Sequence, residues 1–272
     1  MRVLARGAIG EMNVWQTTAL GALAGFTIYL GLPVARLGPR TKTVQNLLNA
    51  LAIGVLLFLV WDILSKAQEP IGEALKAAMK SGHWTAFGSL VFLFVLGLVL
   101  GLIGLVTFAD IARRRSSPDM PRAYQLTLLV ATGLGLHNFS EGLAIGQAAA
   151  TGAIGFAIIL IVGFGLHNVT EGFAVAAPVA AAGEVPSWSF LATAGLIGGG
   201  PTFLGTVIGY HVVSPQAFVL FLALAAGALF YVIGEMYAVG RRFQQPPVAA
   251  WGIIAGFLAA YATDLILTIA GA

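Results

Sequence analysis

Long runs of apolar residues, separated by short polar, basic or proline-containing stretches, dominate this chain of 272 residues. A membrane-spanning helix needs about 20 mostly apolar residues. The runs predict eight spans, near residues 17–35, 44–64, 85–109, 123–150, 152–182, 187–210, 216–239 and 246–270. Only a small turn separates the fourth and fifth spans, so we expect a helical hairpin there. The pattern predicts an all-α integral membrane protein with a single transmembrane domain over residues 1–272.

The composition supports this class. Hydrophobic residues make up 58% of the chain and charged residues 9%, whereas a soluble domain carries about 25% charged residues. A water-soluble globule and a disordered chain are both excluded. The absence of cysteine excludes disulfide scaffolds and thiol catalysis. The first fifteen residues, with Arg2, Arg6 and Glu11, predict a short surface segment and not a cleaved signal peptide.

The basic residues predict the orientation. With the spans placed as above, all 14 Lys and Arg residues fall outside them, and the loops after spans one, three, five and seven carry most of these residues. Basic loops stay in the cytoplasm, so we expect a multi-pass protein of the plasma membrane with both termini outside. The sequence pI of about 9.4 then reflects loop anchoring, and no nucleic-acid partner is expected.

The acidic residues are distributed differently. Five fall within or at the ends of predicted spans: Asp62, Glu141, Glu171, Glu235 and Asp264. A carboxylate inside a bilayer is costly and marks a candidate functional site. Since no Lys or Arg falls inside a predicted span, we expect the counter-charge to be a proton or a bound cation.

One polar motif occurs twice, in the fourth and fifth predicted spans. Residues 133–146 read GLGLHNFSEGLAIG and residues 163–176 read GFGLHNVTEGFAVA, identical at eight of fourteen positions. The shared polar residues are His137, Asn138 and Glu141 in the first copy, and His167, Asn168 and Glu171 in the second. In each copy the His and Glu are four residues apart and share a helix face, and a turn midway between the copies brings them to one depth. Imidazole, carboxylate and amide groups suit a divalent ion such as zinc, iron, manganese or cobalt.

A second, weaker repeat joins spans two and seven. The segment Ala50–Gly54 matches Ala223–Gly227, and an acid follows each glycine after eight residues, Asp62 in one case and Glu235 in the other. These spans run in opposite directions, as in the inverted repeats of many transporters. We expect helices 1–3 and 6–8 to surround the central 4–5 hairpin. Asp62, Glu235 and Asn46 are candidate pathway residues; a solvated helix end is the other interpretation of the two acids.

The duplicated motif resembles the ZIP (zinc- and iron-regulated transporter-like) family, most closely its prokaryotic branch, in which both central helices carry His-Asn-x-Pro-Glu-Gly. The resemblance implies eight spans and a two-ion transport site midway through the bilayer. It places His137, Glu141, His167 and Glu171 at the primary site, and Asn138 and Asn168 with the shared glutamates at the second.

Two departures from the family pattern matter. Ser140 and Thr170 stand where the family has proline, and Gly198-Gly199-Gly200-Pro201 stands where it often has an acidic ligand in span six. Ser and Thr bend a helix more gently, by bonding the preceding turn. Either the second ion is weak or absent, or backbone carbonyls at a broken helix replace the acid.

The motif favours transmembrane transport of divalent transition-metal cations, zinc first, with iron, manganese, cobalt or cadmium as further candidates, by alternating access. The metal would be the substrate, and no organic cofactor is expected. The alternative is an intramembrane metal-dependent enzyme, which we do not favour because the zincin pattern His-Glu-x-x-His is absent. Bis-histidine haem binding and a slow sensor or channel-like variant are further readings. Small-residue faces such as Gly205-x-x-x-Gly209 would permit a homodimer.

Overall fold

The computed structural model describes residues 12–37, 41–115, 120–212 and 214–270. These residues are helical nearly throughout and contain no strand. The elements are α1 (Val14–Phe26), α2 (Ile28–Gly31), the 3₁₀ helix η1 (Leu32–Arg36), α3 (Lys42–Ser81), α4 (Thr85–Arg115), α5 (Arg122–Ala150), α6 (Ile154–Ala181), α7 (Trp188–His211), α8 (Pro215–Gly240), η2 (Arg241–Phe243) and α9 (Pro246–Ala270). The predicted surface segment with Arg2, Arg6 and Glu11 lies outside the described residues, apart from its last few positions.

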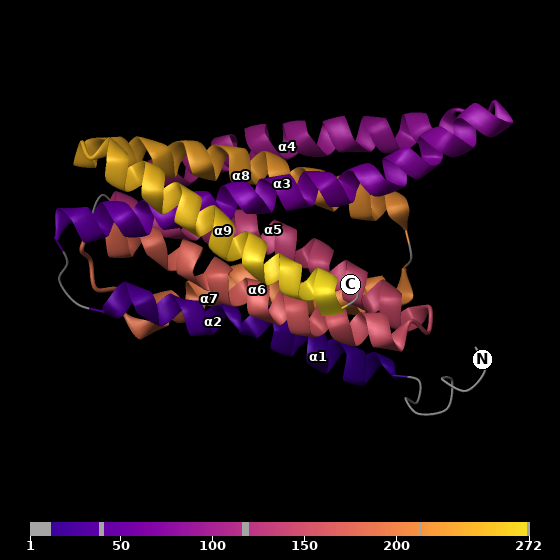
Figure 1. Cartoon of the computed structure of the whole chain (residues 1–272), viewed down its shortest axis with the longest axis horizontal. Helices are drawn as coiled ribbons and strands as arrows, with labels where there is room; N and C mark the ends of the chain where they lie inside the picture. The colour runs from indigo at the N-terminus through magenta and orange to yellow at the C-terminus, as the bar shows by residue number, and fades with distance from the viewer. Residues whose placement is uncertain (1–11, 38–40, 116–119, 213, 271–272) are drawn as a thin grey trace.

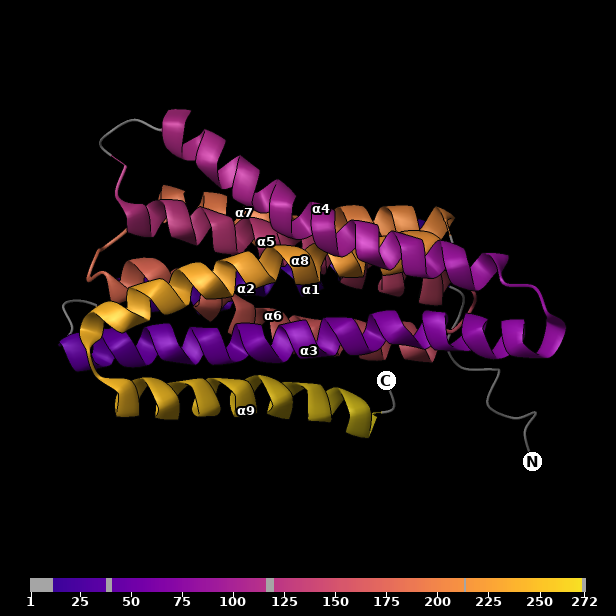
Figure 2. The same cartoon turned by 90° about the horizontal axis from the view of Figure 1, so that it is seen from above.

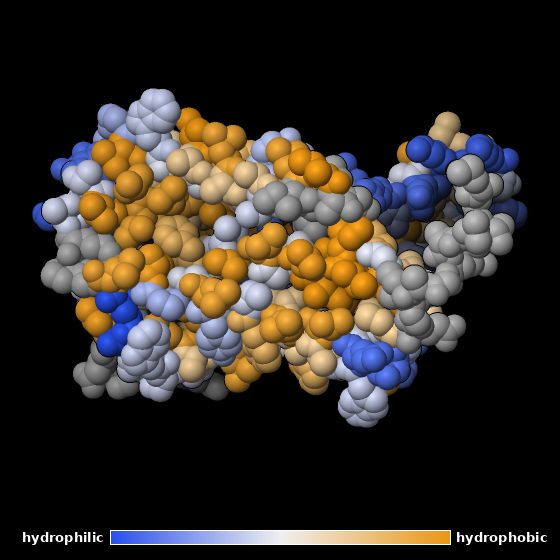
Figure 3. All heavy atoms as spheres, turned by 60° about the horizontal axis from the view of Figure 1, so that its bottom comes forward, coloured by the Kyte–Doolittle hydropathy of each residue, from blue (hydrophilic) through white to orange (hydrophobic). Residues whose placement is uncertain are grey.

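The helices form an all-α membrane bundle, as predicted. Within the described residues, seven helical segments are long and apolar enough to cross a bilayer. The eighth predicted span is α5, whose 29 residues measure about 43 Å; its polar motif lowers its hydropathy, and most of its residues are buried. Figure 3 shows apolar side chains over the middle of one face and hydrophilic ones mainly toward the ends.

The second predicted span is longer than expected. It was predicted to end at residue 64, but α3 continues for 40 residues to Ser81, about 60 Å, and extends beyond the other helices (Figures 1 and 2). Residues 65–81 are rich in Ala, Lys and Glu, which lower hydropathy but favour helix. The helix ends at Gly82, whose φ of 75° suits glycine.

Close contacts at glycines show the inverted repeat. A β-carbon on Gly54 of α3 would lie 2.1 Å from the carbonyl oxygen of Ile253 in α9. A β-carbon on Gly227 of α8 would lie 2.3 Å from the carbonyl oxygen of Leu98 in α4. These glycines are the ones matched in the sequence repeat, and the chain direction in Figure 1 is opposite in α3 and α8. The pair α3–α9 therefore repeats the pair α8–α4 in inverted form, as predicted.

The central hairpin follows the same symmetry. A β-carbon on Gly142 of α5 would lie 2.2 Å from the carbonyl oxygen of Thr202 in α7. A β-carbon on the matching Gly172 of α6 would lie 2.0 Å from the carbonyl oxygen of Ile28 in α2. The lack of a side chain at these glycines lets α5 pack closely against α7 and α6 against α2. The two motif copies therefore have equivalent helix–helix contacts.

The glycine face suggested for a dimer is occupied within the chain. β-Carbons on Gly205 and Gly209 would lie 2.1 Å and 2.3 Å from the carbonyl oxygens of Phe139 and Leu143 of α5. The prediction that this face could serve a homodimer is wrong, because α5 covers it. A homodimer through another surface stays a prediction.

Glycine contacts should control stability. We expect Gly54→Ala and Gly227→Ala each to destabilise the protein by about 1–3 kcal/mol, because the new methyl group meets backbone. Gly104→Ala, with nothing within 4 Å of its β-carbon position, should leave stability unchanged or raise it by up to about 1 kcal/mol. Melting temperatures of the detergent-solubilised variants test this. Equal melting temperatures for Gly54→Ala and Gly104→Ala would contradict the packing described.

Candidate metal centre

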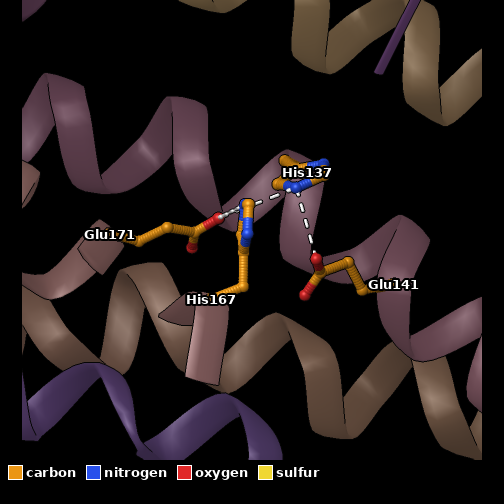
Figure 4. A group of neighbouring side chains, drawn as sticks. All are labelled: His137, Glu141, His167 and Glu171. Carbon is orange, nitrogen blue, oxygen red and sulfur yellow. Dashed lines mark ion pairs between the residues drawn. The ribbon is translucent and has the colours of Figure 1, made fainter. Parts of the chain in front are cut away.

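Helices α5 and α6 form the predicted hairpin. The turn between them contains Gly152, whose φ of 76° only glycine adopts readily. From this turn the two helices run side by side, and their motif copies meet at one depth. The side chains of His137, Glu141, His167 and Glu171 are buried and converge between the helices (Figure 4).

The four groups are close enough together to hold a metal ion. Each of the four residues offers one ligand atom, and all four atoms lie within 4.8 Å of one another. His137 Nε2 lies 3.4 Å from Glu141 Oε1 and 3.6 Å from Glu171 Oε1, and His167 Nε2 lies 3.8 Å from Glu171 Oε1. Nitrogen and oxygen ligands bound tetrahedrally to zinc at about 2.0–2.1 Å are about 3.3 Å apart. Small side-chain shifts would therefore close this site around an ion.

Several nitrogen and oxygen atoms of this cluster have no hydrogen-bond partner among the described residues. Five buried atoms of the four residues lack a hydrogen bond: Nδ1 and Nε2 of His137, Oε2 of Glu141, Nε2 of His167 and Oε1 of Glu171. Buried polar groups in folded proteins are normally hydrogen-bonded, and leaving them unpaired is costly. The concentration of unpaired nitrogen and oxygen atoms at one point favours a cation site over a structural hydrogen-bond network.

The two asparagines donate hydrogen bonds through their side-chain nitrogen atoms. Asn138 Nδ2 donates to Glu171 Oε2 at 2.8 Å and to the carbonyl of Gly198 at 3.0 Å, and Asn168 Nδ2 donates to the carbonyl of Ala24 at 3.0 Å. Their Oδ1 atoms are buried and without a hydrogen bond. The oxygens are thus left free to act as ligands, as predicted for a second ion, and that role stays a prediction.

The structure shows the conformation at both places where the sequence departs from the family pattern. Ser140 Oγ donates to the carbonyl of Leu136 at 3.4 Å, and Thr170 Oγ1 donates to the carbonyl of His167 at 2.7 Å. Both hydroxyls bond the preceding turn, as expected. The suggestion of a broken helix at residues 198–200 is wrong, because α7 is continuous around Pro201. Pro201 has no N–H to donate one turn back, but the helix hydrogen bonds on either side persist.

The structure corrects the prediction for Asp62. Its carboxylate was expected to lack a basic partner, but Lys66 Nζ lies 2.7 Å from Asp62 Oδ2. The prediction failed because the hydropathy boundary at residue 64 placed Lys66 in a loop, whereas α3 continues past it. The i,i+4 spacing of an acid and a lysine could have revealed the pair. Lys66 is the residue of interest that sequence reasoning missed.

The other pathway candidates lie at the opposite end. Glu235 lines a cavity of about 760 Å³, together with residues of α5 and α6 that include Thr132 and Pro178. Asn46 is buried near the start of α3, and its Nδ2 donates to the carbonyl of Gln245 at 3.2 Å. Thr132 precedes His137 by five residues, so the cavity approaches the metal centre from the side of the basic loops.

Metal binding should stabilise the fold. We expect zinc to raise the melting temperature of the purified protein, because a ligand that binds only the native state adds about 2.7 kcal/mol at a hundred times its Kd. His167→Ala and Glu171→Gln should abolish most of this rise. Glu73→Gln, on the exposed part of α3, should keep it. A full zinc response in His167→Ala would show that zinc binds elsewhere.

Comparison with known proteins found one similar protein of stated function. No family model matches the chain. Over 266 residues the chain is 29% identical to the zinc transporter ZupT of Chlorobium phaeovibrioides (strain DSM 265 / 1930), a match that covers 94% of this chain and 98% of that protein. This similarity supports the resemblance of the motifs to the ZIP family.

Proposed function

We propose that this protein transports divalent metal cations, with zinc as the principal substrate, across the membrane through the His/Glu centre of α5 and α6. The observation that carries the proposal is the convergence of four buried ligand residues, five of whose nitrogen and oxygen atoms lack a hydrogen bond within the described chain. The similarity to a zinc transporter over nearly its whole length supports it.

The site would act by replacing the hydration shell of the ion. Histidine binds metal as the neutral imidazole, and the two glutamates supply negative charge that balances a divalent ion. Glu171 is the shared ligand, since its Oε1 lies near both His137 and His167. Asn138 holds the other oxygen of that carboxylate and thereby orients it toward the ion.

The two sides of the centre differ, which supports alternating access. On the side of Glu235 the cavity described above approaches the site. On the other side, apolar residues of α5 and α6 fill the space between the helices; they include Ile145, Ala148, Ala157, Ile161 and Phe164. Because the bundle is an inverted repeat, rocking one group of helices against the other would exchange the open and the closed side.

The orientation follows from the basic residues. The described Lys and Arg residues at the end of the bundle where the cavity lies are Arg36, Lys42, Arg113, Arg114, Arg115, Arg122, Arg241 and Arg242. This end would be cytoplasmic, in the plasma membrane, with both chain termini outside. The cavity would then be the cytoplasmic vestibule.

The ligand set would also accept other transition metals. Imidazole and carboxylate bind iron, manganese and cobalt as well as zinc, and affinity alone rarely determines selectivity. Iron, manganese, cobalt and cadmium are therefore further proposed substrates. An enzymatic function is not supported, because the relative that matches nearly the whole chain is a transporter.

Transport should depend on the centre. In proteoliposomes loaded with a fluorescent zinc indicator, we expect Glu141→Ala and His167→Ala each to reduce zinc flux at least about tenfold, since each removes a ligand worth at least 1.4 kcal/mol. Glu73→Gln serves as the matched acidic control and should transport like the parent. Unchanged flux in both site variants would refute the proposal, and hydrolytic turnover without flux would favour an enzyme.

Access to the cavity should be one-sided. The chain contains no cysteine, so Thr132→Cys introduces a single thiol into the cavity wall. We expect a membrane-impermeant thiol reagent to label it in inside-out vesicles and to label it much more slowly in right-side-out vesicles. Ala131→Cys, at a position with 0% exposure, is the buried control. Faster labelling of Thr132→Cys from the outside would reverse the proposed orientation.

A further inference from the structure

The ion pair of Asp62 and Lys66 lies beyond the metal centre on the side away from the cavity. The ring of Phe58 in α3 lies 6.2 Å from the ring of His167, centroid to centroid. Asp62 and Lys66 follow Phe58 by one and two helical turns, toward the extended end of α3. The ammonium of Lys66 lies 5.4 Å from the ring of Phe164, which precedes His167 by about one turn. The pair thus lies within two turns of the centre, at its outer side.

Lys66 lies next to an acidic side chain of its own helix and an aromatic ring of α6. Its ammonium pairs with Asp62, whose side chain is only 8% exposed. Its charge also acts on the carboxylates of Glu141 in α5 and Asp264 in α9. The ring of Phe164 in α6 supplies a cation–π contact. A tethered positive charge, 34% exposed, therefore lies between α3 and α6, where it pairs with Asp62 and repels other cations.

The inverted repeat has no equivalent lysine on the cavity side. The repeat pairs Asp62 with Glu235, so the position equivalent to Lys66 is Val239. Glu235 and Val239 both line the cavity, and Glu235 makes no ion pair within the described part of the chain. Lys42, Arg122 and Arg242 also line this cavity, but none of them forms an ion pair with Glu235 in the described part of the chain. Asp62 therefore has its counter-charge in place on the outer side, whereas closing the inner side would bury a carboxylate whose ion pair is not formed, which is costly.

We propose that Lys66 is a tethered counter-cation that keeps the outer side of the pathway closed, and that an incoming divalent ion opens this side by displacing the ammonium from Asp62. The proposal rests on the transport function proposed above. It makes the outer-closed conformation the resting one, because on that side the carboxylate already forms an ion pair with a lysine of its own helix.

The test measures access to the outer side directly. Ile145 is fully buried and lies one turn outward of Glu141 on the same helix face, so Ile145→Cys reports on opening. A membrane-impermeant thiol reagent is applied outside, to right-side-out vesicles, in the absence of zinc. The reporter is combined with Lys66→Met, with Asp62→Asn, with both, and with Lys66→Arg, which keeps the charge.

We expect Lys66→Met and Asp62→Asn each to speed labelling of Ile145→Cys at least about tenfold, since each leaves one charge unpaired. Lys66→Arg should label at close to the parent rate. The double variant, which removes both charges, should label more slowly than either single variant. If Lys66→Met does not fold, Asp62→Asn and the double variant provide the test. Labelling at the parent rate in both single variants, or equally fast labelling in Lys66→Arg and Lys66→Met, would overturn the proposal.

Two further readouts separate this proposal from the proposed function. The zinc-induced rise in melting temperature should persist in Lys66→Met, because the four ligands are intact; its loss would mean that Lys66 supports the centre itself and would overturn the gating role. Unchanged labelling together with zinc flux that still requires His167 refutes only the role of Lys66. Zinc flux that does not require His167 refutes the transport site, whatever the labelling shows.

Discussion

The burial of two glutamates and two histidines in one small space is the constraint on which the rest of the structure depends. Their ligand atoms lie within 4.8 Å of one another, and several of them have no hydrogen-bond partner in the described chain. Carboxylates removed from water are stable only when paired or neutralised. Lys66 pairs with a different carboxylate, Asp62, so a transported cation fits this centre better than a permanent internal partner.

The fold supplies this arrangement through symmetry and small residues. The hairpin of α5 and α6 brings two copies of one motif to the same depth, and Gly142 and Gly172 let each helix approach the backbone of its neighbour. The same inverted relation links α3–α9 to α8–α4. It makes the two ends of the pathway comparable, so that their differences carry meaning: a cavity near Glu235 at one end, and apolar packing with a lysine–aspartate pair at the other.

Much of this could be predicted from the sequence, because transfer free energy and helix periodicity act locally. Hydropathy located the helices, and the repeated spacing of His137 and Glu141 predicted their meeting with His167 and Glu171. The repeat of Gly54 and Gly227 marked the inverted partners. The length of α3 could not be found in this way, since hydropathy measures partition into lipid and not helix formation, and Lys66 was misplaced with it. The sequence also did not reveal which helix packs on Gly205 and Gly209, because a small-residue face does not specify the helix that covers it.

The most direct test of the account is anomalous diffraction at the zinc absorption edge, from crystals of the protein grown with zinc. A strong peak is expected, bounded by His137 Nε2, His167 Nε2 and the carboxylates of Glu141 and Glu171. A second peak beside it, near Asn138 and Asn168, would show that a second ion binds although α7 has glycines in place of the acidic ligand. Zinc density elsewhere in the protein, with none among these four side chains, would contradict the central claim.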